Sequence, residues 1–70
     1  MDISTWISIF GRRYSSFLIT LIDANYIMDN IIIYEGGLTG LEEYGSYMID
    51  MIEIGEEKIV MTVYEEDSAE

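Results

Sequence analysis

Cysteine and histidine are both absent from this chain of 70 residues, and only three residues are basic. Without cysteine, no disulfide and no thiolate zinc site can stabilise the fold. The chain therefore lacks the usual proton shuttle near neutral pH and the strongest common nucleophile. Hydrolytic triads and the familiar nitrogen or sulfur metal sites are excluded. We predict that the protein is not an enzyme.

Long apolar runs are missing as well. The longest, around Phe17–Ile22 and Ile31–Tyr34, are far shorter than the roughly 20 residues that a membrane-spanning helix needs. Arg12 and Arg13 follow the first apolar stretch, whereas a signal peptide carries its basic residues before it. We therefore expect no membrane interaction and a cytoplasmic location.

Acidic residues dominate the charge of the chain. Fourteen acidic residues against three basic ones give a formal net charge of −11. Eleven of the acids lie from Glu35 onward, where Lys58 is the only basic residue, so this half carries −10 (11 acids minus 1 base). Solubility needs far less charge, and self-repulsion weakens the compact state. We expect this half to bind a basic protein surface, and not nucleic acid directly, because nucleic-acid affinity depends on neutralising phosphates.

The chain is nevertheless too apolar to be a disordered acidic tail, since half of its residues are hydrophobic. We predict one domain over residues 1–64 and an acidic C-terminal tail over residues 65–70. A chain of this size buries only about 60% of its unfolded surface. A homodimer is therefore expected to cover part of the remaining apolar surface.

The N-terminal segment predicts a short helix over Asp2–Phe10. Asp2 or Ser4 can cap its first amides, and Gly11 is a helix stop signal. The residues that share one face at helical spacing are Trp6, Ile7 and Phe10. An alternative is one helix that continues to Ile22 along Phe10, Tyr14, Phe17, Leu18 and Leu21. Gly11 in mid-helix and the β-branched residues near Ile22 oppose it.

The rest of the chain has mainly strand patterns. Strands are predicted over Phe17–Ile22 and Ile27–Tyr34, with a turn at residues 23–25 and a possible bulge at residues 29–30. A hairpin is predicted from Tyr47–Ile54 and Lys58–Tyr64, joined by the short loop at residues 55–57. The fold class is thus α+β, with a short N-terminal helix and a four-stranded, mainly antiparallel sheet that ends in a C-terminal β-hairpin.

Both faces of the last predicted strand are partly apolar. Ile59, Met61 and Val63 alternate with Val60, Thr62 and Tyr64, and alternate residues point to opposite faces. One face is expected to cover the core. The other is expected to meet the N-terminal helix, a dimer mate or a partner protein.

The segment Gly36-Gly37-Leu38-Thr39-Gly40 is the one glycine-rich loop. It lacks the lysine of a phosphate-binding loop, and Glu35, Glu42 and Glu43 flank it, so we interpret it as a turn. A helical segment is predicted over Leu38–Tyr44, ending at Gly45. Thr39 is its expected N-cap, with Glu42 three residues later, as in a capping box.

Paired carboxylates could in principle support catalysis or bind a cation. Two carboxylates can hydrolyse a glycoside when they flank a cleft, but so short a chain leaves little room for one. A divalent cation needs only oxygen ligands, yet no EF-hand spacing occurs. We expect no catalytic residue, no metal and no cofactor.

Four tyrosines lie among the carboxylates, at positions 34, 44, 47 and 64. Tyrosine combines a large contact area with a hydroxyl and is enriched in binding hot spots. These residues are therefore either anchors for a basic partner or half-buried residues of the sheet. The sequence leaves both interpretations open.

The order of elements resembles that of small acidic proteins of bacteriophages and prophages, some of which are anti-CRISPR or other anti-defence proteins. The resemblance consists of a short helix, an apolar strand, the run Ile31–Gly36, the helical turn Leu41–Tyr44 and a terminal hairpin with an acidic tail. It implies a non-catalytic inhibitor that acts in an infected bacterium. The charge agrees, because an acidic protein can occupy the basic groove of a nucleic-acid-binding defence protein. The residues predicted to bind the partner are Glu35, Glu42, Glu43, Tyr44, Tyr47, Asp50, Glu53, Glu56 and Glu57.

Two other functions remain open at this point. One is a module that sequesters a signalling nucleotide, with Arg12, Arg13 and Lys58 in a pocket at a dimer seam. The other is a structural or assembly protein of a virus, which would form a large defined oligomer.

Overall fold

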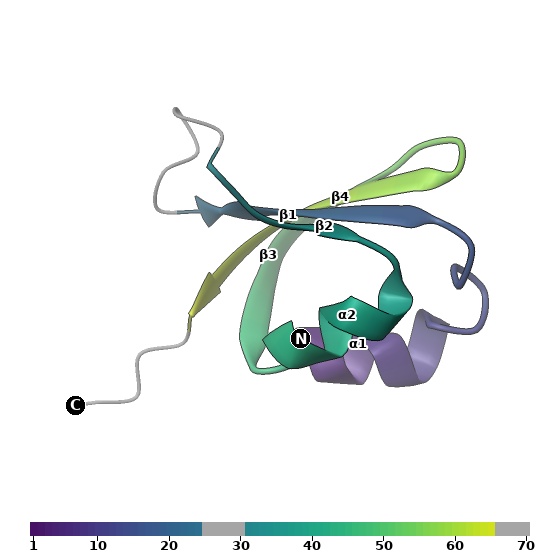
Figure 1. The fold of residues 1–70 in the computed structure, drawn as a ribbon. Coiled ribbons are helices and arrows are strands. Elements are labelled where there is room, and N and C mark those ends of the chain that lie inside the picture. The colour runs from purple at the N-terminus through teal and green to yellow at the C-terminus, as the bar shows by residue number, and fades with distance from the viewer. Residues whose placement is uncertain (25–30, 66–70) are drawn as a thin grey trace.

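The protein is an α+β structure in which two short helical segments lie against one side of a four-stranded sheet (Figure 1). The computed structural model describes residues 1–24 and 31–65. The elements in chain order are α1 (Ile3–Phe10), β1 (Leu18–Asp23), β2 (Ile32–Gly36), α2 (Leu38–Leu41), η2 (Glu42–Tyr44), β3 (Tyr47–Ile54) and β4 (Lys58–Glu65).

The strand order is β2-β1-β4-β3, so the predicted four-stranded sheet is confirmed. Strands β1 and β2 are antiparallel, as are β3 and β4, but β1 and β4 pair in parallel in the centre. The sheet is therefore mixed. Alternating apolar patterns predict local hairpins, whereas this central pairing joins Leu18 to Lys58, 40 positions apart (58 minus 18), and leaves no local signal.

Helix α1 begins and ends where its caps predict. The Asp2 carboxylate accepts a hydrogen bond from the Thr5 amide at 2.8 Å, and the Gly11 amide donates to the Ile7 carbonyl at 2.8 Å. The alternative of one helix to Ile22 is wrong, because residues 11–16 form turns and β1 follows at Leu18. Strand propensity near Ile22 and the stop at Gly11 outweigh the helical spacing of the aromatic residues.

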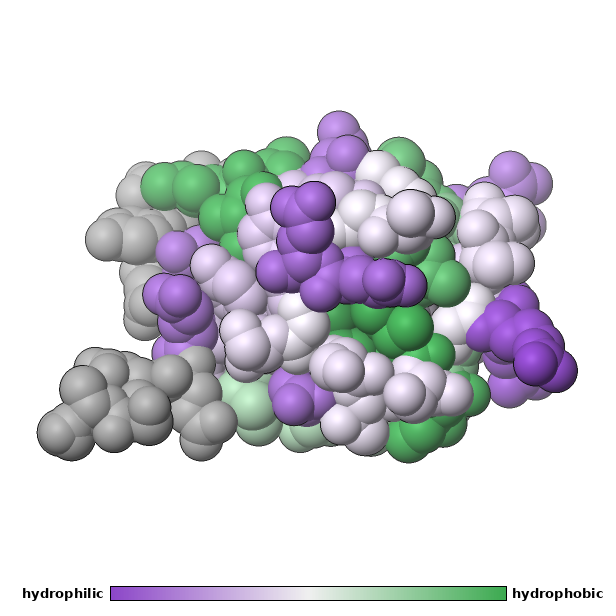
Figure 2. All heavy atoms as spheres, turned by 60° about the horizontal axis from the view of Figure 1, so that its bottom comes forward, coloured by the Kyte–Doolittle hydropathy of each residue, from purple (hydrophilic) through white to green (hydrophobic). Residues whose placement is uncertain are grey.

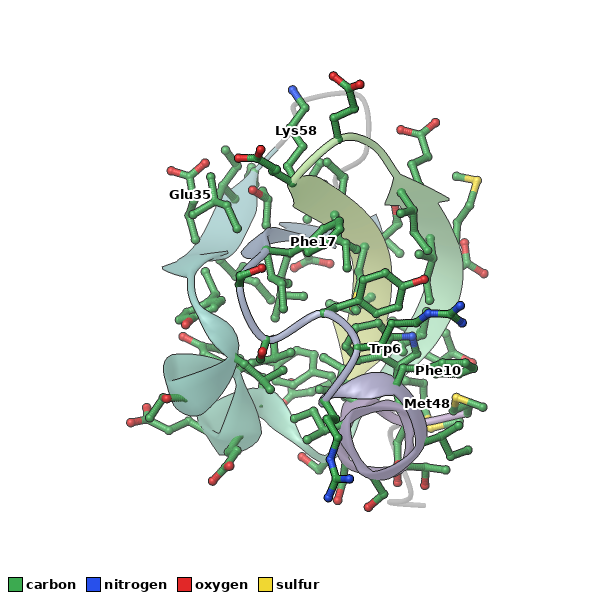
Figure 3. The ribbon with its side chains drawn as sticks, turned by 90° about the vertical axis from the view of Figure 1, so that its right-hand side faces the viewer. Trp6, Phe10, Phe17, Glu35, Met48 and Lys58 are labelled. Atoms are coloured by element: carbon green, nitrogen blue, oxygen red, sulfur yellow. The ribbon has the colours of Figure 1, made fainter. Side chains whose placement is uncertain are left out.

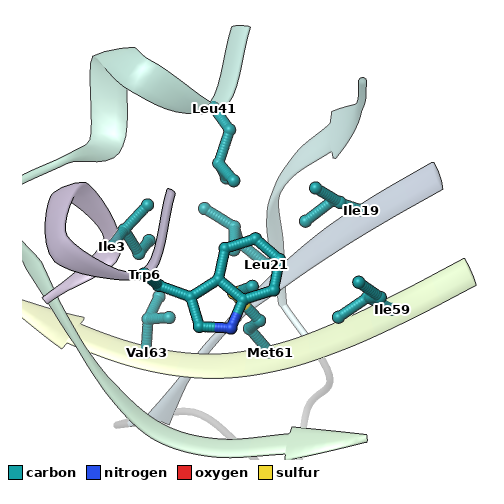
Figure 4. Close-up of a cluster of buried hydrophobic side chains, with 8 residues drawn as sticks. All are labelled: Ile3, Trp6, Ile19, Leu21, Leu41, Ile59, Met61 and Val63. Atoms are coloured by element: carbon teal, nitrogen blue, oxygen red, sulfur yellow. The ribbon is translucent and has the colours of Figure 1, made fainter. Parts of the chain in front are cut away.

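The core lies between α1, the α2–η2 segment and one face of the sheet (Figure 4). Trp6 is 2% exposed and packs over the sheet among residues that are completely buried. Its ring also contacts Phe10 at 5.8 Å and Tyr14 at 5.7 Å between centroids. The other members of this core cluster are Ile3, Ile19, Leu21, Leu41, Ile59, Met61 and Val63.

The predicted C-terminal hairpin is confirmed, and β4 runs one residue beyond the prediction, so that Glu65 belongs to the strand and not to the tail. Its loop closes with a hydrogen bond from the Gly55 amide to the Lys58 carbonyl at 2.8 Å. Glu57, with φ of 65°, takes the left-handed conformation there. A bulge in β3 between Ile49 and Met51 leaves Asp50 unpaired in the ladder.

The middle of the chain agrees only in part with the predictions. The helical segment over Leu38–Tyr44 is confirmed as α2 and η2, and Gly45 caps it. The N-cap is Gly37 and not Thr39. Leu38 packs against the core as the first residue of the helix, so the helix begins before Thr39. Residues 27–30 of the predicted second strand, the bulge at 29–30 and the tail over 66–70 lie outside the described residues.

Candidate functional site

One face of the sheet has no described element against it. Helices α1 and α2 both lie on the opposite side (Figure 1), so the N-terminal helix is not what covers the second apolar face of β4. We call this second face the open face. Alternation along the strands and their register place on it Leu18, Thr20, Ile22, Ile32, Glu35, Met48, Met51, Glu53, Lys58, Val60, Thr62 and Tyr64.

The open face mixes apolar and threonine side chains on its two central strands, and each edge strand adds both a carboxylate and apolar side chains. One row across the strands contains Glu35, Thr20, Val60 and Glu53, so the two carboxylates lie three strand spacings, or about 14 Å, apart. The Thr20 hydroxyl donates to the Glu35 carboxylate at 3.3 Å. The next row contains Ile32, Ile22, Thr62 and Met51.

Four of the nine predicted partner-binding residues lie at the end of the sheet where the β3–β4 hairpin turns. These hairpin-end acids are Glu35, Glu53, Glu56 and Glu57, and all four are exposed. Lys58 lies among them, so this end carries a formal charge of −3 (four carboxylates and one ammonium). In Figure 3, Glu35 and Lys58 lie on the side of the sheet away from Trp6 and Phe10.

The other three predicted carboxylates lie elsewhere. Glu42 and Glu43 are exposed in η2, within the helix layer, and Asp50 is exposed at the bulge of β3. Figure 2 shows the helix side, on which hydrophilic and hydrophobic residues alternate without one large area of either kind. The predicted residues thus do not form one continuous surface, and the hairpin end is the place where four of the seven predicted carboxylates gather.

Tyr44 and Tyr47 are half-buried on the covered side of the sheet and are not part of the hairpin end. The Tyr44 hydroxyl donates to the Ile33 carbonyl at 3.2 Å, and its ring contacts Tyr34 at 5.3 Å and Tyr47 at 5.6 Å. Burial, followed by the charge of Glu65, raises the pKa of Tyr47. These contacts link β2, η2 and β3, which favours the half-buried interpretation of both tyrosines.

The glycine-rich loop is built around Tyr34. A Cβ on Gly40 would lie 2.6 Å from the Tyr34 hydroxyl oxygen, and one on Gly36 would lie 2.8 Å from it. That hydroxyl donates to the Gly37 carbonyl. Glycine therefore serves close packing here, in line with the interpretation as a turn. The sequence left Tyr34 as either an anchor or a half-buried residue and did not predict its packing against the glycines, although it lies two positions before Gly36.

The basic side chains do not converge on a pocket. Arg12 and Arg13 are exposed in the connection after α1, whereas Lys58 lies on the open face. A depression of about 370 Å³ lies beside α1 and η2, lined by Ser4, Ile7, Ser8 and Glu42, and none of these is basic. This arrangement gives no support to a nucleotide pocket formed by the three basic residues within one copy. No group of three potential metal ligands occurs in the part of the chain that the structure describes.

No protein-family model, curated protein or solved structure matches this chain. The resemblance to small acidic phage proteins therefore stays a prediction. Over residues 1–24 and 31–65, no helix has the length and apolar character needed to cross a membrane.

Proposed function

We propose that the protein is a non-catalytic inhibitor that binds a basic surface of a host nucleic-acid-binding defence protein. The observation that carries this proposal is a set of exposed carboxylates that form no ion pair or hydrogen bond with another described residue. This set consists of Glu42, Glu43, Asp50, Glu53, Glu56 and Glu57. Their charge is not used in contacts with other described residues, so it is available to a partner.

The hairpin end is the part of this surface best suited to direct contact. Glu53, Glu56 and Glu57 lie within five positions of one another. Glu56 and Glu57 are in the exposed loop of the hairpin, and Glu53 lies just before it. Glu35 extends the group to the other edge of the sheet. An exposed ion pair contributes only about 0.2–1 kcal/mol, so several of these acids must act together, and water must leave the contact for the affinity to be high.

The acids that lie elsewhere support the same function at longer range. Glu42, Glu43 and Asp50 add to the negative potential without sharing the hairpin end. A potential of this kind raises the association rate with a basic partner and falls with ionic strength. We therefore assign contact to the hairpin-end acids and steering to the acids of η2 and the bulge.

Inhibition follows from competition for one groove. Proteins that hold nucleic acid align Lys and Arg with its phosphates. The two edge carboxylates, Glu35 and Glu53, are about 14 Å apart, so they can contact separate basic side chains of such a groove. A protein bound there would exclude the nucleic acid from the groove.

A capture experiment with matched charge reversals tests this proposal. The tagged protein is incubated with bacterial lysate at low and at high salt, and retained proteins are identified by mass spectrometry. The contact variant replaces Glu53, Glu56 and Glu57 with Lys. The control variant replaces Glu42, Glu43 and Asp50 with Lys. Each changes the net charge equally, from −11 to −5 (−11 plus 6).

We expect the wild-type protein to retain a nucleic-acid-binding protein at low salt and to release it at high salt. The contact variant should lose this protein, whereas the control variant should retain most of it. Retention that is indifferent to salt and to both variants would refute electrostatic recognition. Equal loss in both variants would refute the hairpin end as the contact surface and leave only a general effect of charge.

A further inference from the structure

We infer that the open face is a self-association surface on which the same face of a second copy packs, giving a weak two-fold dimer. This inference does not rest on the proposed function, because it is argued from the apolar side chains of the face, but Glu35 and Glu53 on that face also belong to the hairpin-end acids. Sheets commonly bury their apolar faces by packing face to face, about 10 Å apart.

The composition of the open face differs from that of a solvated sheet surface. A sheet with one side in water usually alternates apolar inward with polar outward residues, and parallel strands are usually covered on both sides. Here the central strands β1 and β4 are parallel, and only one of their faces meets helices. The apolar residues left exposed on the other face are Leu18 at 45%, Ile32 at 54%, Met51 at 48% and Tyr64 at 37%.

The charge of the open face favours a second copy over a basic partner. The face carries the carboxylates of Glu35 and Glu53 and the ammonium of Lys58, a formal charge of −1 (one minus two), out of −11 for the chain. Two copies can therefore bring these faces together with little local repulsion, and Lys58 of each copy supplies the only basic group there. A strongly basic partner would instead be drawn to the hairpin loop with Glu56 and Glu57 and to η2 with Glu42 and Glu43.

The size of the face sets the expected strength. Four strands about 4.8 Å apart and about six residues of about 3.3 Å each give roughly 400 Å² per copy. Two copies would bury roughly 800 Å², which is below the about 1,200–2,000 Å² of standard interfaces. Interfaces of about 1,600 Å² have dissociation constants from micromolar to picomolar. Because this interface would be smaller, we expect a dissociation constant in the micromolar range or weaker.

Sedimentation equilibrium over a wide concentration range tests the dimer with a matched pair of variants. Ile32→Lys places a charge on the open face, and Ile9→Lys places the same charge on α1, where Ile9 is 58% exposed. We expect a monomer–dimer equilibrium for the wild type, at least a tenfold higher dissociation constant for Ile32→Lys, and no change for Ile9→Lys. A wild type that stays monomeric, or equal weakening by both variants, would overturn the inference, and so would assembly into a larger oligomer.

Crosslinking keeps the inference testable if Ile32→Lys does not fold. The chain has no cysteine, so one introduced cysteine gives one possible disulfide. Val60→Cys lies in the middle of the open face, and Ser8→Cys lies on α1, where Ser8 is exposed. Rapid oxidation of Val60→Cys to a covalent dimer, with little for Ser8→Cys, is the expected result. Equal yields for both would overturn the inference.

Salt separates this association from binding to a basic partner. Two copies each carry −11, so screening should lower their repulsion and tighten the dimer. The same screening should weaken the attraction of a basic partner. A dimer that weakens as salt is added would overturn the inference. Binding of a basic partner that does not change with salt would overturn only the proposed function.

Discussion

Replacement of Gly40 by alanine tests whether the glycine-rich loop serves packing. The added Cβ would lie 2.6 Å from the Tyr34 hydroxyl oxygen and 3.0 Å and 3.1 Å from two carbons of its ring. Contacts under 3.0 Å force something to move, and Tyr34 is restrained by its hydrogen bond to Gly37 and by the ring of Tyr44. The strain must therefore disturb the packing between β2 and η2.

The expected cost follows from three terms. Overpacking costs about 1–3 kcal/mol, and loss of the hydroxyl hydrogen bond costs about 1 kcal/mol. Alanine in place of glycine within α2 offsets about 1 kcal/mol. We expect Gly40→Ala to lower the free energy of unfolding by about 2 kcal/mol, which corresponds to a fall in Tm of about 8–16 °C for a domain of this size.

Urea denaturation in two backgrounds identifies the cause. In the Tyr34→Leu background the close contact is removed, so Gly40→Ala should be neutral or stabilising there. Gly37→Ala is the control, because a Cβ on Gly37 meets nothing within 4 Å. Its cost should be smaller and should not depend on Tyr34. If Gly40→Ala costs nothing, or costs the same in both backgrounds, the packing explanation is refuted.

Three further outcomes are expected. Burial raises the folded-state pKa of Tyr47 above its ordinary value of 10.0. The contribution of the Tyr47 hydroxyl to the free energy of unfolding should therefore be complete below about pH 10 and lost above it. Tyr47→Phe should remove this loss in urea titrations at alkaline pH. Because the hydrogen bond from Thr5 lowers the folded-state pKa of Asp2 below 3.8, its contribution should be present above that pH and lost as the pH falls; Asp2→Asn should keep the cap but remove this acid dependence. Leu41→Ala, at a fully buried position, should cost about 2–5 kcal/mol, seen as a large fall in Tm by circular dichroism.

The sequence predicted the elements whose signals are local. Asp2 and Gly11 bound α1 as expected, and the hairpin of β3 and β4 has the loop that its glycine indicates. Caps and tight turns depend on residues a few positions apart, so one sequence contains their whole signal. The parallel pairing of β1 with β4 depends on residues 40 positions apart (58 minus 18) and could not be predicted in this way.

The candidate site could be predicted only in part. The charge of each acid is evident from the sequence, but its position around the molecule depends on the strand order, which places Glu35 and Glu53 on opposite edges of the sheet. For Tyr44 and Tyr47 the sequence left two interpretations open, and the contacts of Tyr44 with Tyr34 and with Tyr47 favour the half-buried one. Apolar residues on both faces of β4 predicted a second covered surface, but not which face α1 would leave open.

Displacement of nucleic acid from the captured partner tests the central claim most directly. Fluorescence anisotropy would follow a labelled nucleic acid bound to that partner as the acidic protein is added. We predict that the wild type displaces the nucleic acid at low salt, and that high salt or the Glu53, Glu56 and Glu57 charge reversals abolish the displacement. Binding of the protein to its partner while the nucleic acid stays bound, or displacement unaffected by both changes, would contradict the account.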